Sequence, residues 1–197
     1  MANILQSLQR TIIAAFVLLL LVILIETSVS GNAIAFSHAW GSFVMRWLHV
    51  ISGVMWIGLL WYFNFVQIPS MPQIPDEQKP AVSKVIAPRA LFWFRYAALA
   101  TVITGLLVAW MQGYIAQALT LQHGVVAIGL GIWIALLMAF NVWFIIWPNQ
   151  KKALGIVVVE AAEKAQAARM AMLTSRFNTM LSITMLYMMV AQQNGGL

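Results

Sequence analysis

The chain has 197 residues, of which 62% are hydrophobic and only 8% are charged. A soluble globular domain carries roughly 25% charged residues, and a soluble fold of this length has too high a surface-to-volume ratio to bury so much apolar surface. The net charge of +6 comes from basic residues in short gaps between apolar runs, which is typical of membrane loops and argues against nucleic-acid binding. The composition therefore predicts a protein in contact with a lipid bilayer. The chain has no cysteine, which excludes disulfides, thiolate metal sites and c-type haem attachment.

The apolar runs predict an all-α, polytopic membrane helix bundle with about five transmembrane helices. The first run is longer than the core of an ordinary signal peptide, about 7–15 residues, so we interpret it as an uncleaved helix. Prolines at Pro69, Pro72 and Pro75 are expected to end the second helix, and Pro148 the fourth. The five helices are expected, within a single transmembrane domain spanning 1–197, at residues 11–29, 41–66, 88–111, 122–147 and 174–191.

The segment 151–173 is rich in alanine and carries charged residues. We expect it to form a helical extension of the fifth transmembrane helix on the cytoplasmic side. Glu160 and Lys164 are four residues apart and can pair on one face of that helix.

The basic residues predict the orientation of the bundle. Arg10 precedes the first helix, and the connections 30–40 and 112–122 contain no Lys or Arg. The other two connections, with their helix boundaries, hold Lys79, Lys84, Arg89, Lys151, Lys152, Lys164, Arg169 and Arg176. Because positive loops stay in the cytoplasm, the N-terminus is expected inside and the C-terminus outside.

Under this topology, all three histidines collect near the outer surface. His49 lies in the outer third of the second helix, with Arg46 on the same face one turn further out. His123 is expected at the outer end of the fourth helix, and His38 and Glu26 lie near the same surface. Polar residues inside a bilayer are costly and need a reason.

The spacing around His49 allows a flat cofactor beside the helix. Gly53 follows His49 by one turn and leaves room for a macrocycle, and Arg46 could pair with its propionates. The fourth helix carries a similar face of small residues that begins at His123. We therefore expect a b-type haem held by Arg46, His49, Gly53 and His123, with His49 and His123 as metal ligands. The alternative is that these histidines form ordinary hydrogen bonds and that the small residues serve helix–helix contacts.

Three sequence stretches carry a resemblance to a known family. Residues 46–58 read RWLHVISGVMWIG and continue as WYFNF at 61–65. Residues 138–142 read MAFNV, 145–152 read IIWPNQKK, and 175–179 read SRFNT. Together they resemble the membrane (N-terminal) domain of bacterial cytochrome-c-coupled urate oxidase, in a short form without the cytochrome c tail. The resemblance implies a multi-pass protein of the bacterial cytoplasmic (inner) membrane with a redox role. The family pattern places further histidines where this chain has Phe177, Gln192 and Gln193, so His49 alone carries over.

These observations lead to two main functional hypotheses. The first is a small integral membrane redox-type subunit that binds haem b for electron transfer and exchanges electrons with quinol or a periplasmic carrier. The second is a non-catalytic accessory subunit that packs against a larger membrane protein complex or forms a homo-oligomer. Small residues on the fourth helix, Gly124, Ala127, Gly131, Ala135 and Ala139, favour such helix association. Metal or small-solute transport is a third alternative. The sequence assigns no catalytic residue and leaves open whether the protein is an enzyme.

Overall fold

The computed structural model describes residues 2–196, and all regular secondary structure in that range is helical. This confirms the predicted all-α class. The chain divides into two units, Met1–Trp40 and Gly41–Leu197, which are described separately.

The first unit contains one long apolar helix. A short helix α1 (Ala2–Leu5) precedes α2 (Leu8–Ser30), which is close to the predicted span of 11–29. Gly31 ends α2 in the left-handed conformation, with φ of 72°, and its N–H donates to the carbonyl of Thr27. Glycine adopts this conformation without the steric cost that a Cβ would add.

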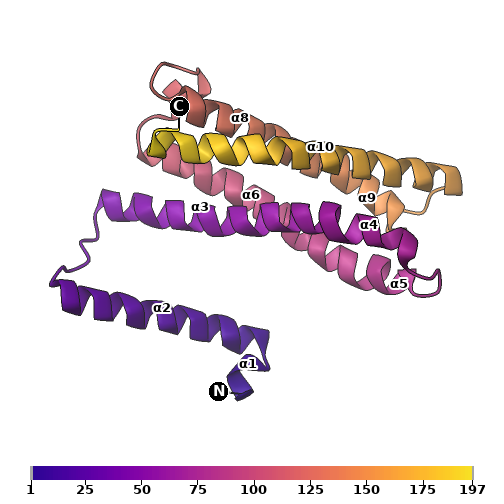
Figure 1. Ribbon diagram of the computed structural model, residues 1–197, viewed down its shortest axis with the longest axis horizontal. Coiled ribbons are helices and arrows are strands. Elements are labelled where there is room, and N and C mark those ends of the chain that lie inside the picture. The colour runs from indigo at the N-terminus through magenta and orange to yellow at the C-terminus, as the bar shows by residue number, and fades with distance from the viewer. Residues whose placement is uncertain (1, 197) are drawn as a thin grey trace. The chain divides into compact units, whose positions relative to one another are not determined.

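The second unit begins with an antiparallel pair of long helices (Figure 1). The first helix runs through Pro69 and Pro72 to Gln73, seven residues beyond the predicted end. Each of these prolines stands in the first turn of a new helical segment within this continuous helix, and Pro69 comes directly after a π-helical turn. The segments of this pair are α3 (His38–Trp61), η1 (Tyr62–Gln67), α4 (Ile68–Ser70), η2 (Met71–Gln73), α5 (Lys79–Ala81), η3 (Val82–Ile86) and α6 (Ala87–Met111), with η1 and η3 π-helical and η2 a 3₁₀ helix.

A second antiparallel pair completes the bundle. The predicted fourth helix begins at Val126 instead of 122, because Leu121 and Gly124 have φ of 54° and 87° and form a turn. It then passes Pro148, which again lies in the first turn of a new segment, and ends at Ala153. The segments are α7 (Ile115–Leu119), α8 (Val126–Phe140), π-helical η4 (Asn141–Ile146), α9 (Trp147–Ala153) and α10 (Ala161–Asn194).

The predicted cytoplasmic extension and the fifth helix form one continuous helix, α10. The prediction of a helix from 151 onward was wrong for residues 154–160, which connect α9 to α10. Glu160 is the N-cap of α10 and has an extended backbone. Among the described residues, the ion pairs are Lys79–Asp76 and Lys152–Glu163, so the expected pairing of Glu160 with Lys164 is not formed. The partner of Lys152 comes from the neighbouring helix, which local spacing does not reveal.

Four helical stretches are long and apolar enough to cross a membrane. They are Leu8–Ser30, His38–Gln73, Lys79–Met111 and Val126–Ala153. The protein is therefore a membrane protein whose apolar helices contact the lipid bilayer. α10 has 34 residues and sufficient length, but it is more polar than these four. The count of five membrane crossings therefore stays a prediction.

The lysines of the second unit gather at one end of the bundle. Lys79 and Lys84 lie on the turn into α6, while Lys151 and Lys152 lie on the turn between α9 and α10. We call this the inner end, after the predicted topology, and the opposite end, which carries Tyr114 and the end of α10, the outer end.

The inner half of the bundle has a closely packed apolar core. Trp56, Leu60, Phe94 and Met138 are at most 1% exposed and come from three different helices. The ring of Phe94 meets that of Phe63 edge-on, with centroids 5.7 Å apart. Such aromatic and aliphatic side chains remove large apolar areas from the surrounding solvent or lipid and fix the helices at close distance.

Buried amide side chains connect α10 to the core through hydrogen bonds. The Nδ2 of Asn141 donates to the Oδ1 of Asn178 at 2.8 Å, and the Nδ2 of Asn178 donates to the Met138 carbonyl at 2.9 Å. The Nδ2 of Asn64 donates to the Ser175 hydroxyl at 2.8 Å. These pairs place Ser175 and Asn178 of α10 against other helices. The charged residues of α10, Glu163, Lys164, Arg169 and Arg176, are exposed.

Candidate functional site

A cavity of about 630 Å³ lies between the helices of the bundle, toward its outer end, and it is partly open, since Val50, Val54 and Val190 in its lining are each more than half exposed. This volume falls within the range of about 300–1,000 Å³ that is usual for small-molecule and cofactor sites. Cofactor sites in helix bundles are built in this way, from side chains on facing helices. Four helices line it: α3 (with Arg46, His49 and Gly53), α6 (with Thr101 and Gly105), α8 (with Ile128 and Ile132) and α10 (with Met185, Met189 and Gln193).

His49 is the only histidine that lines the cavity. Its Nδ1 lies 2.9 Å from the carbonyl oxygen of Thr101 on α6. A carbonyl can only accept, so Nδ1 must carry the proton and donate it. The lone pair of the neutral ring is then on Nε2, which has no hydrogen-bond partner among the described residues. An imidazole with this tautomer is prepared to bind a metal, because histidine ligands usually donate their second nitrogen to a carbonyl or carboxylate.

Gly105 makes the close approach of the His49 ring to α6 possible. A Cβ added at Gly105 would lie 2.7 Å from the Cε1 and 2.9 Å from the Nδ1 of His49, closer than real Cβ atoms approach a neighbour. Gly53, in contrast, has room, since its added Cβ would meet only a methyl of Thr101 at 3.9 Å. The glycine that the ring requires is therefore on the facing helix, whereas Gly53 contributes open space along the cavity wall.

Arg46 lies at the outer mouth of the cavity. Its Nη1 donates to the Oε1 of Gln193 on α10 at 3.2 Å, and both residues line the cavity. Tyr114 lines the same end from the connection after α6, and burial raises the pKa of its phenol above the ordinary value. The mouth therefore presents one guanidinium and neutral polar groups, above a chamber whose other walls are mainly apolar.

Side-chain hydrogen bonds hold α3 around the cavity. At the outer end, Arg46 contacts Gln193, and the Nε2 of Gln112 donates to the Ser42 hydroxyl at 2.6 Å. Further in, the Nε1 of Trp61 donates to the Ser182 hydroxyl at 3.0 Å. The helix is thus joined to α6 and α10 at positions that flank the cavity, with open volume between them.

The structure brings together three of the four predicted site residues. Arg46, His49 and Gly53 line one cavity, whereas His123 does not. His123 is exposed in the turn that precedes α8, because Gly124 with its positive φ stands between it and the helix. Sequence reasoning missed Thr101, Gly105 and Met189. A threonine and a glycine four residues apart on one face of a helix were the available signal for the first two.

The metal-binding donors of the cavity are few. Among residues 2–196, three or more His, Cys, Asp or Glu side chains nowhere come together in a group that could hold a metal ion. The cavity offers one imidazole, from His49, and the thioethers of Met185 and Met189. This set is unsuited to a free divalent cation such as Zn²⁺, which takes four ligands. It fits a haem iron, whose four equatorial positions come from the macrocycle and which needs only axial ligands from the protein.

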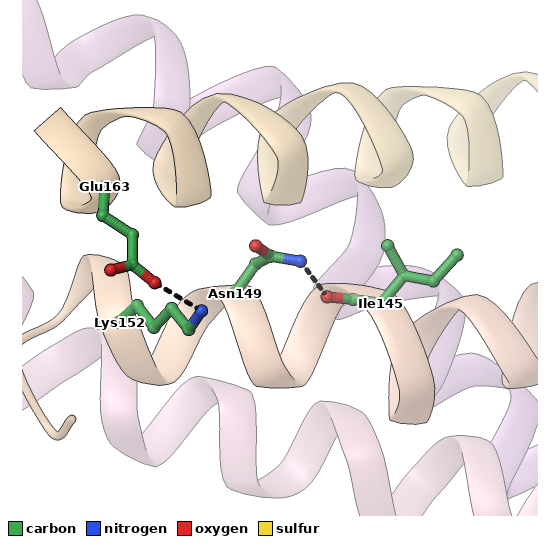
Figure 2. A network of polar contacts seen from close by, with 4 residues as sticks. All are labelled: Ile145, Asn149, Lys152 and Glu163. Atoms are coloured by element: carbon green, nitrogen blue, oxygen red, sulfur yellow. Dashed lines mark hydrogen bonds and ion pairs between the residues drawn. The ribbon is translucent and has the colours of Figure 1, made fainter. Parts of the chain in front are cut away.

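A second, smaller pocket of about 270 Å³ lies at the inner end between α9 and α10. Figure 2 shows its Lys152–Glu163 ion pair, 2.7 Å long, and the Asn149 side chain, whose Nδ2 donates to the Ile145 carbonyl at 2.8 Å. Each of these polar groups has a partner within the chain. The pocket is therefore well explained as part of the contact between the two helices.

No protein family model, curated protein or solved structure matches this chain. The resemblance to the urate oxidase membrane domain therefore stays a prediction from the sequence stretches.

Proposed function

We propose that this protein is a small membrane redox subunit whose bundle cavity holds a b-type haem through the Nε2 of His49. The observation that carries the proposal is the tautomer of His49, which the Thr101 carbonyl sets at 2.9 Å, in the wall of a cavity of about 630 Å³. A polar nitrogen without a hydrogen-bond partner in mainly apolar surroundings is costly unless a ligand uses it.

Arg46 supports the same ligand from the mouth of the cavity. It stands one turn outward from His49 on α3, so its guanidinium is placed to bind carboxylates at the outer rim. At present its Nη1 donates only to the neutral amide of Gln193. An amphipathic ligand with an apolar ring system and anionic groups at one edge would match both the chamber and its mouth.

The bound haem would supply one-electron chemistry. The residues of the chain would hold the group, orient it and keep water away. The Nε2 of His49 would bind the iron, and the bond from Nδ1 to the Thr101 carbonyl would fix the orientation of the ring and increase the basicity of Nε2. The apolar walls from α8 and α10 would limit the access of water and so help to set the reduction potential.

The direct test is the absorption spectrum of the protein purified in mild detergent after expression with ample haem. The unmodified protein is expected to show a b-type spectrum. His49→Ala is expected to lose the pigment, and Arg46→Ala to keep it with weaker retention. His123→Ala is the matched control and should leave the spectrum unchanged. A colourless unmodified protein, or full pigment in His49→Ala, would overturn the proposal.

The second candidate function, an accessory subunit of a larger complex, has less support. The small residues that favoured association with a partner helix are used within the chain: Ala127, Gly131 and Ala135 are buried. A Cβ added at Gly131 would meet the Met188 and Met189 side chains of α10 at 3.3–3.4 Å. Gly124, the first residue of the expected face, is not in the helix. A homo-oligomer or partner complex therefore has to use another surface.

We place the protein in the bacterial inner membrane with its N-terminus in the cytoplasm. The gathering of lysines at one end of the bundle supports this orientation. A periplasmic reporter fused after residue 197 is expected to be active, and one inserted near Lys84 inactive. The reverse result would invert the bundle and place the mouth of the cavity in the cytoplasm.

A further inference from the structure

We propose that Met189 of α10 is the second axial ligand opposite His49, an inference that rests on the haem proposed above. The sequence reasoning assigned this role to His123, which is exposed in a turn and does not line the cavity. Met189 does line it, from the helix that faces α3.

The contact between Arg46 and Gln193 provides a common reference level for the two helices. It joins α3 to α10 at the outer mouth, with 3.2 Å between Nη1 and Oε1. His49 is three residues further along α3, which is about 4.5 Å inward at 1.5 Å per residue. α10 runs in the opposite direction, and Met189 precedes Gln193 by four residues, about 6 Å inward. Counted from this contact alone, the Cα of Met189 lies about 1.5 Å inward of that of His49.

The inner contact between the helices confirms that they run antiparallel along this stretch. The indole of Trp61 donates to the Ser182 hydroxyl at 3.0 Å, further in on both helices. Met185, the other thioether in the cavity, lies about 12 Å inward from Gln193 and so closer to this contact. Met185 is also 4% exposed and is one of the buried residues of the inner core, whereas Met189 is partly buried and packs against that core. Counted from the inner contact, His49 lies about 18 Å outward along α3 and Met189 about 10.5 Å outward along α10. The two contacts together place Met189 about 1.5–7.5 Å inward of His49, which makes it the cavity methionine nearest to the level of His49.

Gly131 of α8 allows Met189 to occupy this position. An added Cβ at Gly131 would lie 3.4 Å from the Sδ and 3.3 Å from the Cε of Met189. A glycine here lets the thioether rest against the α8 backbone while remaining in the cavity wall. Methionine is flexible enough to turn its sulfur toward a ligand without a shift of the helix.

Ligation by histidine and methionine has a defined consequence for the iron. A thioether is a softer donor than a second imidazole and raises the reduction potential. The protein would then favour the reduced haem and be suited to take electrons from a donor such as a quinol. It would pass them to a carrier of higher potential.

The test compares Met189→Leu with the matched control Met185→Leu, both purified with bound haem. The unmodified protein is expected to be six-coordinate and low-spin, with a near-infrared band from thioether-to-iron charge transfer. Met189→Leu is expected to retain the haem but to become five-coordinate, high-spin and readily reactive with carbon monoxide. Met185→Leu should keep the low-spin spectrum. A further variant, Met189→His, should stay low-spin with a lower midpoint potential.

Three results would overturn the ligand assignment while leaving the haem in place, of which the first two concern the unmodified protein and Met189→Leu. One is a five-coordinate unmodified protein, and the other is a low-spin spectrum that survives in Met189→Leu. A low-spin spectrum lost in His123→Ala would assign the position to that histidine instead. A protein that binds no haem at all would instead remove the proposed function together with this inference.

Discussion

The inner and outer halves of the bundle are built from the same helices but hold together differently. In the inner half, Leu60 of α3 packs directly into a core with Phe94 and Met138, and all three are at most 1% exposed. In the outer half, the cavity lies between α3 and its neighbours, the His49 ring contacts α6 at Gly105, and polar side chains join α3 to the other helices at distances of 2.6–3.2 Å.

This difference has a physical consequence for function. Direct packing leaves no volume for a ligand, since protein interiors are as dense as molecular crystals. Hydrogen bonds between side chains at the edges of the cavity can hold α3 further from α6 and α10, because the two bonded side chains together span the space between the helices. The inner half therefore provides the stability that allows the outer half to remain hollow around His49.

The largest loss of stability is expected from a substitution that removes a side chain from the packed core of the inner half. Phe94→Ala removes a ring that is 1% exposed and should lower the free energy of unfolding by about 3–5 kcal/mol. Phe92→Ala is the matched control, since Phe92 is on the same helix but 47% exposed, and should cost less than about 1 kcal/mol. Denaturation in detergent micelles measures both. Equal losses would show that the inner half is no better packed than the lipid-facing surface.

An intermediate effect is expected from the buried amides. Asn178→Ala leaves the Nδ2 of Asn141 and the Met138 carbonyl without their partner and should cost about 1–3 kcal/mol. Asn194→Ala removes an exposed amide that bonds only within its own helix, and its cost should be a few tenths of a kcal/mol. The same denaturation assay compares them. A neutral Asn178→Ala would mean that apolar contacts alone hold α10 in the inner half.

The smallest effect on stability is expected in the hollow half. Gly105→Ala places a methyl within 2.7 Å of the His49 ring, so the ring must turn and lose its bond to Thr101. Gly58→Ala adds the same methyl where no atom lies within 4 Å. Alanine favours a helix over glycine by up to about 1 kcal/mol, so Gly58→Ala should stabilise the protein and Gly105→Ala should not.

The His49 resonance in an NMR spectrum reports the displacement of the ring directly. An unchanged imidazole environment in Gly105→Ala, together with a gain in stability equal to that of Gly58→Ala, would contradict the close contact between α3 and α6.

The helices could be predicted well from the sequence because lipid imposes a length and a composition on each membrane span. The errors were at helix ends. Pro69 and Pro148 do not end their helices because π-helical segments and new first turns accommodate them. The turn at Gly124 delays the start of α8, because a positive φ cannot continue a helix. Proline and glycine act through local backbone geometry, and apolar periodicity does not report that geometry.

The sequence by itself determined the helical membrane class and placed Arg46, His49 and Gly53 on one face of α3, because residues three or four apart share a helical face. Only the tertiary structure decided what faces them. Thr101 and Gly105 lie more than fifty residues further along the chain, and Met189 on the last helix, yet all three line the same cavity as His49. Such partners depend on how four separate helices pack, and this packing depends on the shapes of all contacting side chains. The spacing of residues within one helix gives no information about those contacts.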